Sequence, residues 1–308
     1  MFGILGKGFG LYGYLPAIVS LGESVGTLSA YKDYIEDRDD ISDLSKHIQY
    51  FNNQDDLIEK SDSLVIARRP KDQYRLVKKI LNDQIKLNLF LEKPLTPSCT
   101  TSQYLFNKLQ SGEYNYRIGY TVEFTDWFFD VVNLLNNQSF KNLELEIFWN
   151  FHAYHYINKI NTWKKNPFQG GGAFKFYGTH LVYLLANVGK WDNVKMESFR
   201  HSLEDEYMFL LSGKNKTRKF NISCNSCSPG KSVFDVKVKS NGKSIYHCAL
   251  TDPLFRNSNL KQRDSRIPML KALISSMNSK VDYPKLYLEL FKITELAIDN
   301  QYINLSKH

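Results

Sequence analysis

The sequence has few cysteines and no long apolar run, and both absences narrow what the protein can be. Its 308 residues include only four cysteines, too few and too unevenly spaced for a disulfide framework. No apolar stretch reaches the length that a bilayer-spanning helix needs, and the start of the chain does not resemble a signal peptide. We therefore expect a reduced, cytoplasmic protein with no membrane partner.

Long runs of one charge are also absent. The chain has 40 Lys and Arg against 32 Asp and Glu, a formal net charge of +8, yet no basic run exceeds two or three residues. We find no motif that reads DNA or RNA, and we predict no nucleic-acid partner. A phosphate-bearing cofactor or substrate explains the basic surplus equally well.

Metal-ligand clusters are scarce. Cys224 and Cys227 have the spacing of a ligand pair, and His247 with Cys248 could complete a set. However, Cys224 ends an expected strand, and no second close pair follows at zinc-finger spacing. We predict packing cysteines and no metal site.

The first part of the chain alternates between short apolar runs and helical patterns. Expected strands cover residues 2–5, 25–30, 48–51, 63–67 and 87–91, and expected helices cover 12–21, 73–81 and 102–109. Strands separated by helices of this length form a parallel sheet with right-handed crossovers. We therefore predict an α/β dinucleotide-binding domain over residues 1–118.

The pattern changes after Arg117. Helices are expected at 126–135, 170–188 (after a glycine-rich loop), 268–276 and 284–298, and strands at 143–149, 194–201, 207–211, 218–224, 233–238 and 244–248. Ser212–Asn215 and Asn241-Gly242 carry turn signals between these strands. We predict an α+β domain over residues 119–308, dominated by one antiparallel sheet. The last two helices either belong to this α+β domain or pack back on the first domain.

A glycine-rich segment, Gly6-Lys7-Gly8-Phe9-Gly10-Leu11-Tyr12-Gly13, joins the first strand to the first helix. Such a turn lets the backbone approach a pyrophosphate, which the helix N-terminus then holds. Two registers compete. The one that starts at Gly6 follows the strand directly but has Leu11 at its third position, whereas the one that starts at Gly8 is complete but late. We favour the first and predict that Gly6, Gly8, Phe9 and Gly10 contact the cofactor.

The end of the second strand bears on the choice of cofactor. It reads Ser29-Ala30-Tyr31-Lys32, with no carboxylate before Asp33 to hold the ribose hydroxyls. Without that carboxylate a 2′-phosphate is not repelled, and Ser29 and Lys32 could bind one. We predict NAD or NADP, with a slight preference for NADP.

Two further segments carry candidate chemistry. Glu92-Lys93-Pro94 follows the fifth strand, where open α/β sheets bind ligands, and a lysine there can lie beside a nicotinamide. The segment Gly170-Gly171-Gly172-Ala173-Phe174-Lys175-Phe176-Tyr177-Gly178-Thr179-His180 places a histidine about two helical turns after a glycine loop.

Together, the glycine turn, Glu-Lys-Pro, Trp163-Lys164 and the glycine–histidine block resemble the glucose–fructose oxidoreductase/inositol dehydrogenase (Gfo/Idh/MocA) family over essentially the whole chain. The resemblance implies a Rossmann domain followed by a domain with a large open-faced, mostly antiparallel sheet, which often forms a homodimer or homotetramer. It also implies NAD(P)-dependent hydride transfer to or from a sugar, cyclitol or nucleotide-linked sugar.

The resemblance also assigns roles to residues. Lys93 matches the family's catalytic or substrate-positioning lysine, His180 matches its acid/base histidine, and the Lys93–Pro94 bond is expected to be cis. Arg69, Pro70 and Glu92 join Lys93 as expected cofactor contacts. The expected substrate contacts are Lys93, Trp163, Lys164, Phe176, Tyr177 and His180. Three lysines, Lys164, Lys165 and Lys175, are candidate phosphate contacts.

The chain departs from the family at two positions. Phe176 stands where members commonly have an aspartate, and Tyr74 stands where many have the histidine of Pro-x-x-x-His. A missing carboxylate removes one acid–base group, but Lys93 and His180 could still support turnover. Two alternatives remain open: a catalytically silent dinucleotide-binding sensor or scaffold, and a reductase of a linear tetrapyrrole or an imine.

Overall fold

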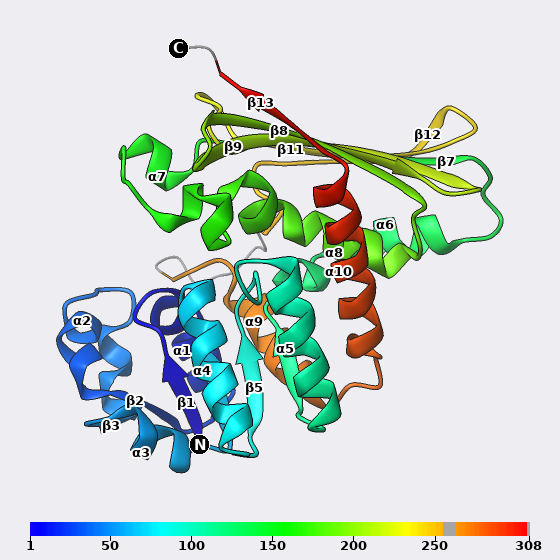
Figure 1. Ribbon diagram of the computed structural model, residues 1–308. Helices are drawn as coiled ribbons and strands as arrows, with labels where there is room; N and C mark the ends of the chain where they lie inside the picture. The colour runs from blue at the N-terminus through cyan, green and yellow to red at the C-terminus, as the bar shows by residue number, and fades with distance from the viewer. Residues whose placement is uncertain (255–262, 307–308) are drawn as a thin grey trace. The chain divides into compact units, whose positions relative to one another are not determined.

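The computed structural model describes residues 1–254 and 263–306, which form two compact units (Figure 1). Each unit is drawn from three stretches of the chain. The first comprises Met1–Thr96, Tyr104–Phe124 and Leu254–Val281, and the second comprises Pro97–Gln103, Thr125–Pro253 and Asp282–His308. Among the described residues, no helix is both long and apolar enough to cross a membrane.

The first unit is built on a six-stranded, entirely parallel sheet in the order β3-β2-β1-β4-β5-β6. This is the doubly wound order of dinucleotide-binding folds, and it reverses direction between β1 and β4. Its strands are β1 (Phe2–Leu5), β2 (Val25–Leu28), β3 (Ile48–Phe51), β4 (Ser63–Ile66), β5 (Asn88–Leu91) and β6 (Tyr116–Ile118).

Helices connect these strands, and further helices that follow the last strand in sequence belong to the same unit. The longer ones are α1 (Leu15–Ser20), α3 (Gln54–Glu59), α4 (Pro70–Asn82), α5 (Cys99–Ser111) and α9 (Ile267–Ser275). Short helical segments are η1 (Gly10–Tyr14), η2 (Ser29–Tyr31), α2 (Lys32–Glu36), η3 (Ser42–His47), η4 (Thr121–Phe124) and η8 (Ser276–Asn278). Proline at the first position of α4 starts that helix.

The core of the first unit lies between the sheet and the helices. Ile4, Val65 and Phe90 from three strands pack with residues of α1 and α9, and all of them are buried. Late in the chain, α9 thus supplies Leu270 and Leu273 to a core whose strands come from the first third.

The second unit has a seven-stranded sheet in the order β12-β11-β7-β10-β9-β8-β13. Two of its pairings, β7 with β10 and β8 with β13, are parallel and the other four are antiparallel. The strands are β7 (Leu143–Asn150), β8 (Asn193–Ser202), β9 (Asp205–Lys214), β10 (Arg218–Asn225), β11 (Val233–Ser240), β12 (Lys243–Leu250) and β13 (Gln301–Leu305). The predicted fold class is confirmed.

Helices cover one face of this second sheet (Figure 1). They are α6 (Asp126–Asn136), α8 (Thr179–Val188) and α10 (Tyr283–Asp299), with short segments α7 (Tyr154–Ile157), η5 (Trp163–Lys165), η6 (Pro167–Gln169) and η7 (Ala173–Gly178). The strand β7 alternates buried and less buried residues, as expected of a sheet with one covered face.

One predicted turn is confirmed and another is wrong. Asn241 and Gly242 both have positive φ and close the β11–β12 hairpin. In contrast, Ser212–Lys214 lies inside β9, which runs on to its end before the chain turns. Gly213 is needed for packing: a Cβ there would lie 2.6 Å from the ring of Phe220 on the neighbouring strand.

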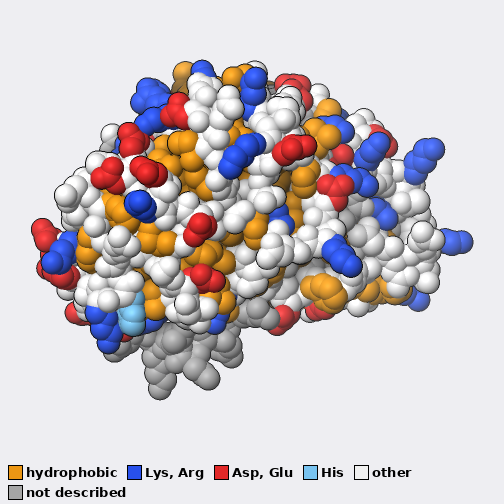
Figure 2. Space-filling model, turned by 90° about the horizontal axis from the view of Figure 1, so that it is seen from below, with side chains coloured by type: hydrophobic (Ala, Val, Ile, Leu, Met, Phe, Trp, Pro, Cys, Tyr) orange, Lys and Arg blue, Asp and Glu red, His pale blue; other side chains and the backbone are white. Residues whose placement is uncertain are grey.

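The surface mixes charges of both signs. On the face shown in Figure 2, Lys and Arg side chains lie among Asp and Glu side chains, with hydrophobic side chains between them.

Candidate functional site

The glycine turn of the first unit leaves β1 at the point where the strand order reverses. Gly6 has φ +152°, and a Cβ there would lie 2.2 Å from the carbonyl oxygen of Ala67, just beyond β4. Only glycine lets the chain pass this close to the neighbouring strand. The turn therefore lies at the switch point where open α/β sheets bind ligands.

The next two glycines have different surroundings. A Cβ at Gly8 would meet nothing within 4 Å, so the backbone there is uncovered. A Cβ at Gly10 would lie 3.1 Å from Ile4 and 3.2 Å from Ala67, so Gly10 lets the helix pack closely on the strands. These are the roles of the second and third fingerprint glycines, and Gly10 fills the third in place of Leu11.

The later register is not supported by this packing. A Cβ at Gly13 would lie 2.4 Å from the ring of Phe9 rather than against the sheet. The turn that begins at Gly6 therefore fits a dinucleotide pyrophosphate, with its backbone open at Gly8 and a helix N-terminus directly after it.

The other predicted cofactor residues of this unit lie at the same edge of the sheet. Because all strands are parallel, the carboxyl ends of β1, β2, β4 and β5 meet there. Ser29 follows β2 and donates a hydrogen bond to Asn52 (3.2 Å), while Lys32 lies 3.9 Å from Glu36. The remaining residues follow β4 or β5 and are Arg69, Pro70, Glu92 and Lys93.

The Glu92-Lys93-Pro94 turn is held by a buried glutamine. The Lys93–Pro94 bond is cis, as predicted. The Gln73 amide nitrogen donates to the carbonyl oxygens of Glu92 (2.7 Å) and Leu95 (2.9 Å), and the Glu92 N–H donates to Gln73 Oε1 (2.9 Å). Gln73 thus fixes the backbone on both sides of Lys93.

Sequence reasoning missed this clamp, although a signal was present. Gln73 shares helix spacing with the buried Leu76, Val77 and Ile80, so it is a polar residue on an apolar helix face. It also directly precedes Tyr74, the position where many family members have histidine. A buried amide at such a place needs hydrogen-bond partners, and here they are backbone groups of Glu92 and Leu95.

The Glu92 side chain is bonded as well. The Tyr14 hydroxyl donates to Glu92 Oε1 (2.9 Å). Burial raises the pKa of Glu92 above its usual range, while the positive charge of Lys93 and the Tyr14 hydrogen bond act in the opposite direction.

A second missed residue reaches the glycine turn from far along the chain. The Arg266 guanidinium precedes α9, lies 4.1 Å from the centroid of the Phe9 ring, and is bonded to both carboxylate oxygens of Asp264 (2.9 and 2.7 Å). No local pattern predicts this contact, because it joins residues more than two hundred positions apart in sequence.

In the second unit, the triple-glycine loop is shaped by close contacts. Gly170 and Gly172 have φ of 86° and 80°, and a Cβ at Gly171 would lie 2.0 Å from the carbonyl oxygen of Trp163. The loop leads through η7 into α8, where His180 is only 2% exposed. The glycines therefore bring Trp163 against the start of the helix that carries His180.

Four predicted substrate residues lie together beside this loop. The ring centroids of Trp163 and Phe176 are 5.5 Å apart, those of Phe176 and Tyr177 are 4.8 Å apart, and Lys164 Nζ lies 5.4 Å from the Phe176 centroid. Phe151 extends the cluster at 4.7 Å from Tyr177. We call Phe151, Trp163, Phe176 and Tyr177 the aromatic wall. Phe176, which contacts both Trp163 and Tyr177, stands at the position where the family commonly has an aspartate.

Solved structures with this architecture identify the fold. WlbA dehydrogenase from Bordetella pertussis, in complex with NADH and UDP-GlcNAcA, is 12% identical, with 97% of this chain and 95% of that one covered (TM-score 0.74). Myo-inositol 2-dehydrogenase from Lactobacillus plantarum is 12% identical (97% and 96% covered, TM-score 0.72). A super-repressor mutant of Gal80p from Saccharomyces cerevisiae is 14% identical (97% and 95% covered, TM-score 0.71).

The chain has the fold of the Gfo/Idh/MocA dehydrogenases. No protein-family model matches its sequence, and no curated protein matches it either. The predicted resemblance is thus confirmed at the level of the fold. GenD2 and WlbA structures were solved with NAD or NADH, which leaves the slight preference for NADP unsupported.

Two of the three lysines predicted to contact a phosphate have partners within the protein. Lys175 was expected to be available, but its Nζ donates to the carbonyl oxygens of Pro97 (3.0 Å) and Pro167 (2.8 Å), and burial lowers its pKa. Lys165 lies 3.7 Å from Asp205. Lys175 therefore ties two loops together.

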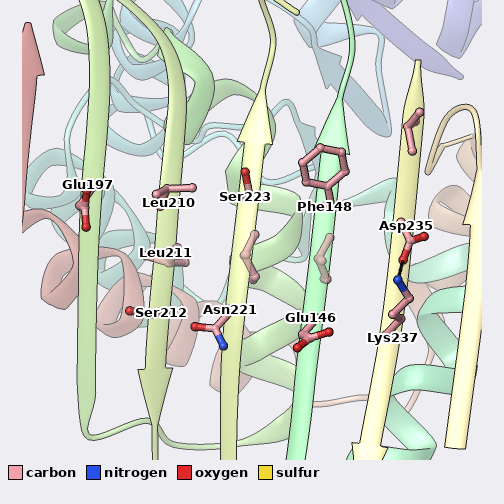
Figure 3. Close-up of a pocket in the computed structure, with 13 residues that line it drawn as sticks. Glu146, Phe148, Glu197, Leu210, Leu211, Ser212, Asn221, Ser223, Asp235 and Lys237 are labelled. Carbon is pink, nitrogen blue, oxygen red and sulfur yellow. Dashed lines mark ion pairs between the residues drawn. The ribbon is translucent and has the colours of Figure 1, made fainter. Parts of the chain in front are cut away.

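The open face of the second sheet carries a shallow trough (Figure 3). Side chains of five neighbouring strands line it, including Glu146, Phe148, Glu197, Asn221 and Lys237. None of the predicted site residues belongs to this trough. It is therefore separate from the candidate site.

Proposed function

We propose that the protein is an NAD(P)-dependent oxidoreductase that transfers a hydride to or from a sugar, cyclitol or nucleotide-linked sugar. One observation carries the proposal: Gln73 clamps the turn that bears Lys93 at the same sheet edge as the glycine turn fitted to a dinucleotide. A lysine held at the carboxyl end of β5 is suited to act on a substrate oxygen beside a nicotinamide.

The chain's own residues then have defined tasks. The bound nicotinamide would accept or supply the hydride at its C4 atom. In the oxidation direction, the hydroxyl proton passes to His180, while Lys93 donates a hydrogen bond to the oxygen and stabilises its developing negative charge. In the reduction direction, both groups act as acids toward the carbonyl oxygen.

The substrate contacts that we propose are Lys93, Lys164, His180 and the aromatic residues Trp163, Phe176 and Tyr177. Aromatic rings pack against the apolar face of a sugar ring, and Lys164 adds a positive charge beside them. WlbA was solved with UDP-GlcNAcA, a nucleotide-linked sugar, and this supports testing that substrate class first.

A silent dinucleotide-binding protein is the second candidate. Phe176 lies among Trp163 and Tyr177, at the position where the family commonly has a carboxylate, so one acid–base group is missing. Gal80p, which was solved as a super-repressor mutant, has the same fold. The two candidates predict the same cofactor site and differ only in turnover.

Nicotinamide absorbance separates these candidates. Purified protein is mixed with NAD or NADP and a panel of sugars, UDP-sugars and dTDP-sugars. We expect turnover with at least one of them, reduced by about 10²–10⁴-fold in Lys93→Ala. Lys60→Ala, at an exposed position just after α3, is the matched control and should keep wild-type rates. Cofactor binding without any turnover would favour the silent protein.

A further inference from the structure

Asp205 and Glu206 are adjacent carboxylates at the start of β9. Both contact the segment of the second unit that carries the proposed substrate residues. We call residues 154–180 the site segment, because it includes Trp163, Lys164, Phe176, Tyr177 and His180. Asp205 contacts its first part, and Glu206 contacts the glycine loop near its end. Neither carboxylate is expected from the sequence to take part in the site.

Asp205 holds the part of the segment that leads to Trp163 and Lys164. The Tyr156 hydroxyl donates to Asp205 Oδ1 (2.5 Å), and Lys165 Nζ lies 3.7 Å from Oδ2. Lys165 also lies 4.5 Å from the centroid of the Tyr156 ring. Asp205, Tyr156 and Lys165 therefore form one connected group directly beside Lys164.

Glu206 holds the start of the helix that leads to His180. It is 2% exposed, and its Oε1 accepts the backbone N–H of Phe174 (2.9 Å). Its Oε2 accepts from the Ser198 hydroxyl (2.7 Å) and from Arg200 (3.4 Å). A Cβ at Gly172 would lie 2.7 Å from Oε1, so the glycine loop is packed directly on this carboxylate.

The charge distribution explains why both anchors are acidic. No Asp or Glu occurs between Glu146 and Asp192, whereas this stretch contains Lys159, Lys164, Lys165, Lys175 and Lys190. The site segment has no carboxylate of its own, so the negative charge that holds it comes from the β8–β9 hairpin. Charge-assisted hydrogen bonds are roughly twice as strong as neutral ones.

We propose that Asp205 and Glu206 are positioning residues with separate effects on the site. Asp205 orients Trp163 and Lys164, and so acts on substrate binding. Glu206 sets the glycine loop and the start of the His180 helix, and so acts on the proton-transfer step. The inference rests on the function proposed above.

The test separates KM from kcat. Asp205→Asn and Tyr156→Phe weaken the same contact and should each raise KM by about tenfold with kcat nearly unchanged. Glu206→Gln places an amide donor toward Arg200. We expect it to lower kcat by about tenfold with little change in KM, because a small misplacement of a catalytic group lowers the rate by that factor or more. Glu204→Gln, exposed in the same hairpin, should match the wild type.

Amide hydrogen exchange gives a second measurement that needs no substrate. In Glu206→Gln, backbone amides of residues 170–180 should exchange severalfold faster than in the wild type or in Glu204→Gln. Wild-type exchange in that segment would overturn the inference, as would variants that change KM and kcat alike. If the wild type turns over no substrate, the proposed function fails, while the exchange data still decide whether Glu206 holds the loop.

Discussion

Two buried polar side chains, Gln73 and Glu206, hold irregular backbone segments through hydrogen bonds. Gln73 bonds the turn around Lys93, and Glu206 bonds the loop before His180. In each case, a side chain from a regular element fixes an irregular segment. Buried partners of this kind are costly to remove, because the backbone groups left behind lose their hydrogen bonds.

His155 should make the stability of the protein depend on pH. It is 5% exposed, and burial, with the charges of Lys164 and Lys165, lowers its pKa to about 4. Between about pH 6.5 and 4 the unfolded chain therefore binds a proton that the folded chain does not, and stability falls as pH falls. We expect a loss of about 2 kcal/mol between pH 7 and 5 from this group.

Urea unfolding at the two pH values checks this expectation. His155→Leu should remove that part of the pH dependence, whereas His47→Gln, at an exposed position, should retain it. An equal pH dependence in wild type and His155→Leu would contradict the assignment.

The two glycine-rich turns differ in what surrounds them. The first is pressed against a neighbouring strand at Gly6 and left open at Gly8. The second is enclosed by Trp163 on one side and Glu206 on the other. The first therefore keeps backbone available to a ligand, and the second is fixed by the protein around it.

Alanine at Gly6 and at Gly8 should give opposite results. Gly6→Ala forces a Cβ to within 2.2 Å of Ala67 and should destabilise the fold by about 1–3 kcal/mol. Gly8→Ala meets nothing within 4 Å, so it should leave the melting temperature nearly unchanged and weaken dinucleotide binding. Thermal unfolding and fluorescence titration with NADH measure the two effects. Unchanged NADH affinity in Gly8→Ala would argue against this turn as the pyrophosphate site.

We propose that subunits meet at the open face of the second sheet. Phe148 is 45% exposed on β7, within the trough of Figure 3. An arginine there would place an unpaired charge in an interface. We expect the wild type to be a dimer or tetramer by light scattering, and Phe148→Arg to shift it toward the monomer.

Phe129 provides the control for this experiment. It is 65% exposed on α6, a helix on the covered side of the same sheet, so Phe129→Arg should leave the mass unchanged. A monomeric wild type, or a Phe148→Arg variant of unchanged mass, would show that the open face does not join subunits.

Much of the fold follows from local patterns. The strands 2–5, 48–51 and 63–67 and the helix over 73–81 are predicted by apolar spacing, and the structure has them within a few residues. The short strand β6 and the edge strand β13 were missed, because three to five residues carry too little periodic signal. The cis bond before Pro94 was expected from the family resemblance rather than from any local pattern.

Neighbouring residues encode the order of the elements, the glycine turn and the segments with Lys93 and His180, so these features follow from the amino-acid sequence alone. The folded structure was needed to show which glycine packs on the sheet, that Gln73 clamps the Lys93 turn, and that Lys175 donates to loop carbonyls. It also brought Arg266 to Phe9 and Glu206 to Phe174. These contacts join distant parts of the chain, and their free energy depends on burial and partner geometry that no local pattern records.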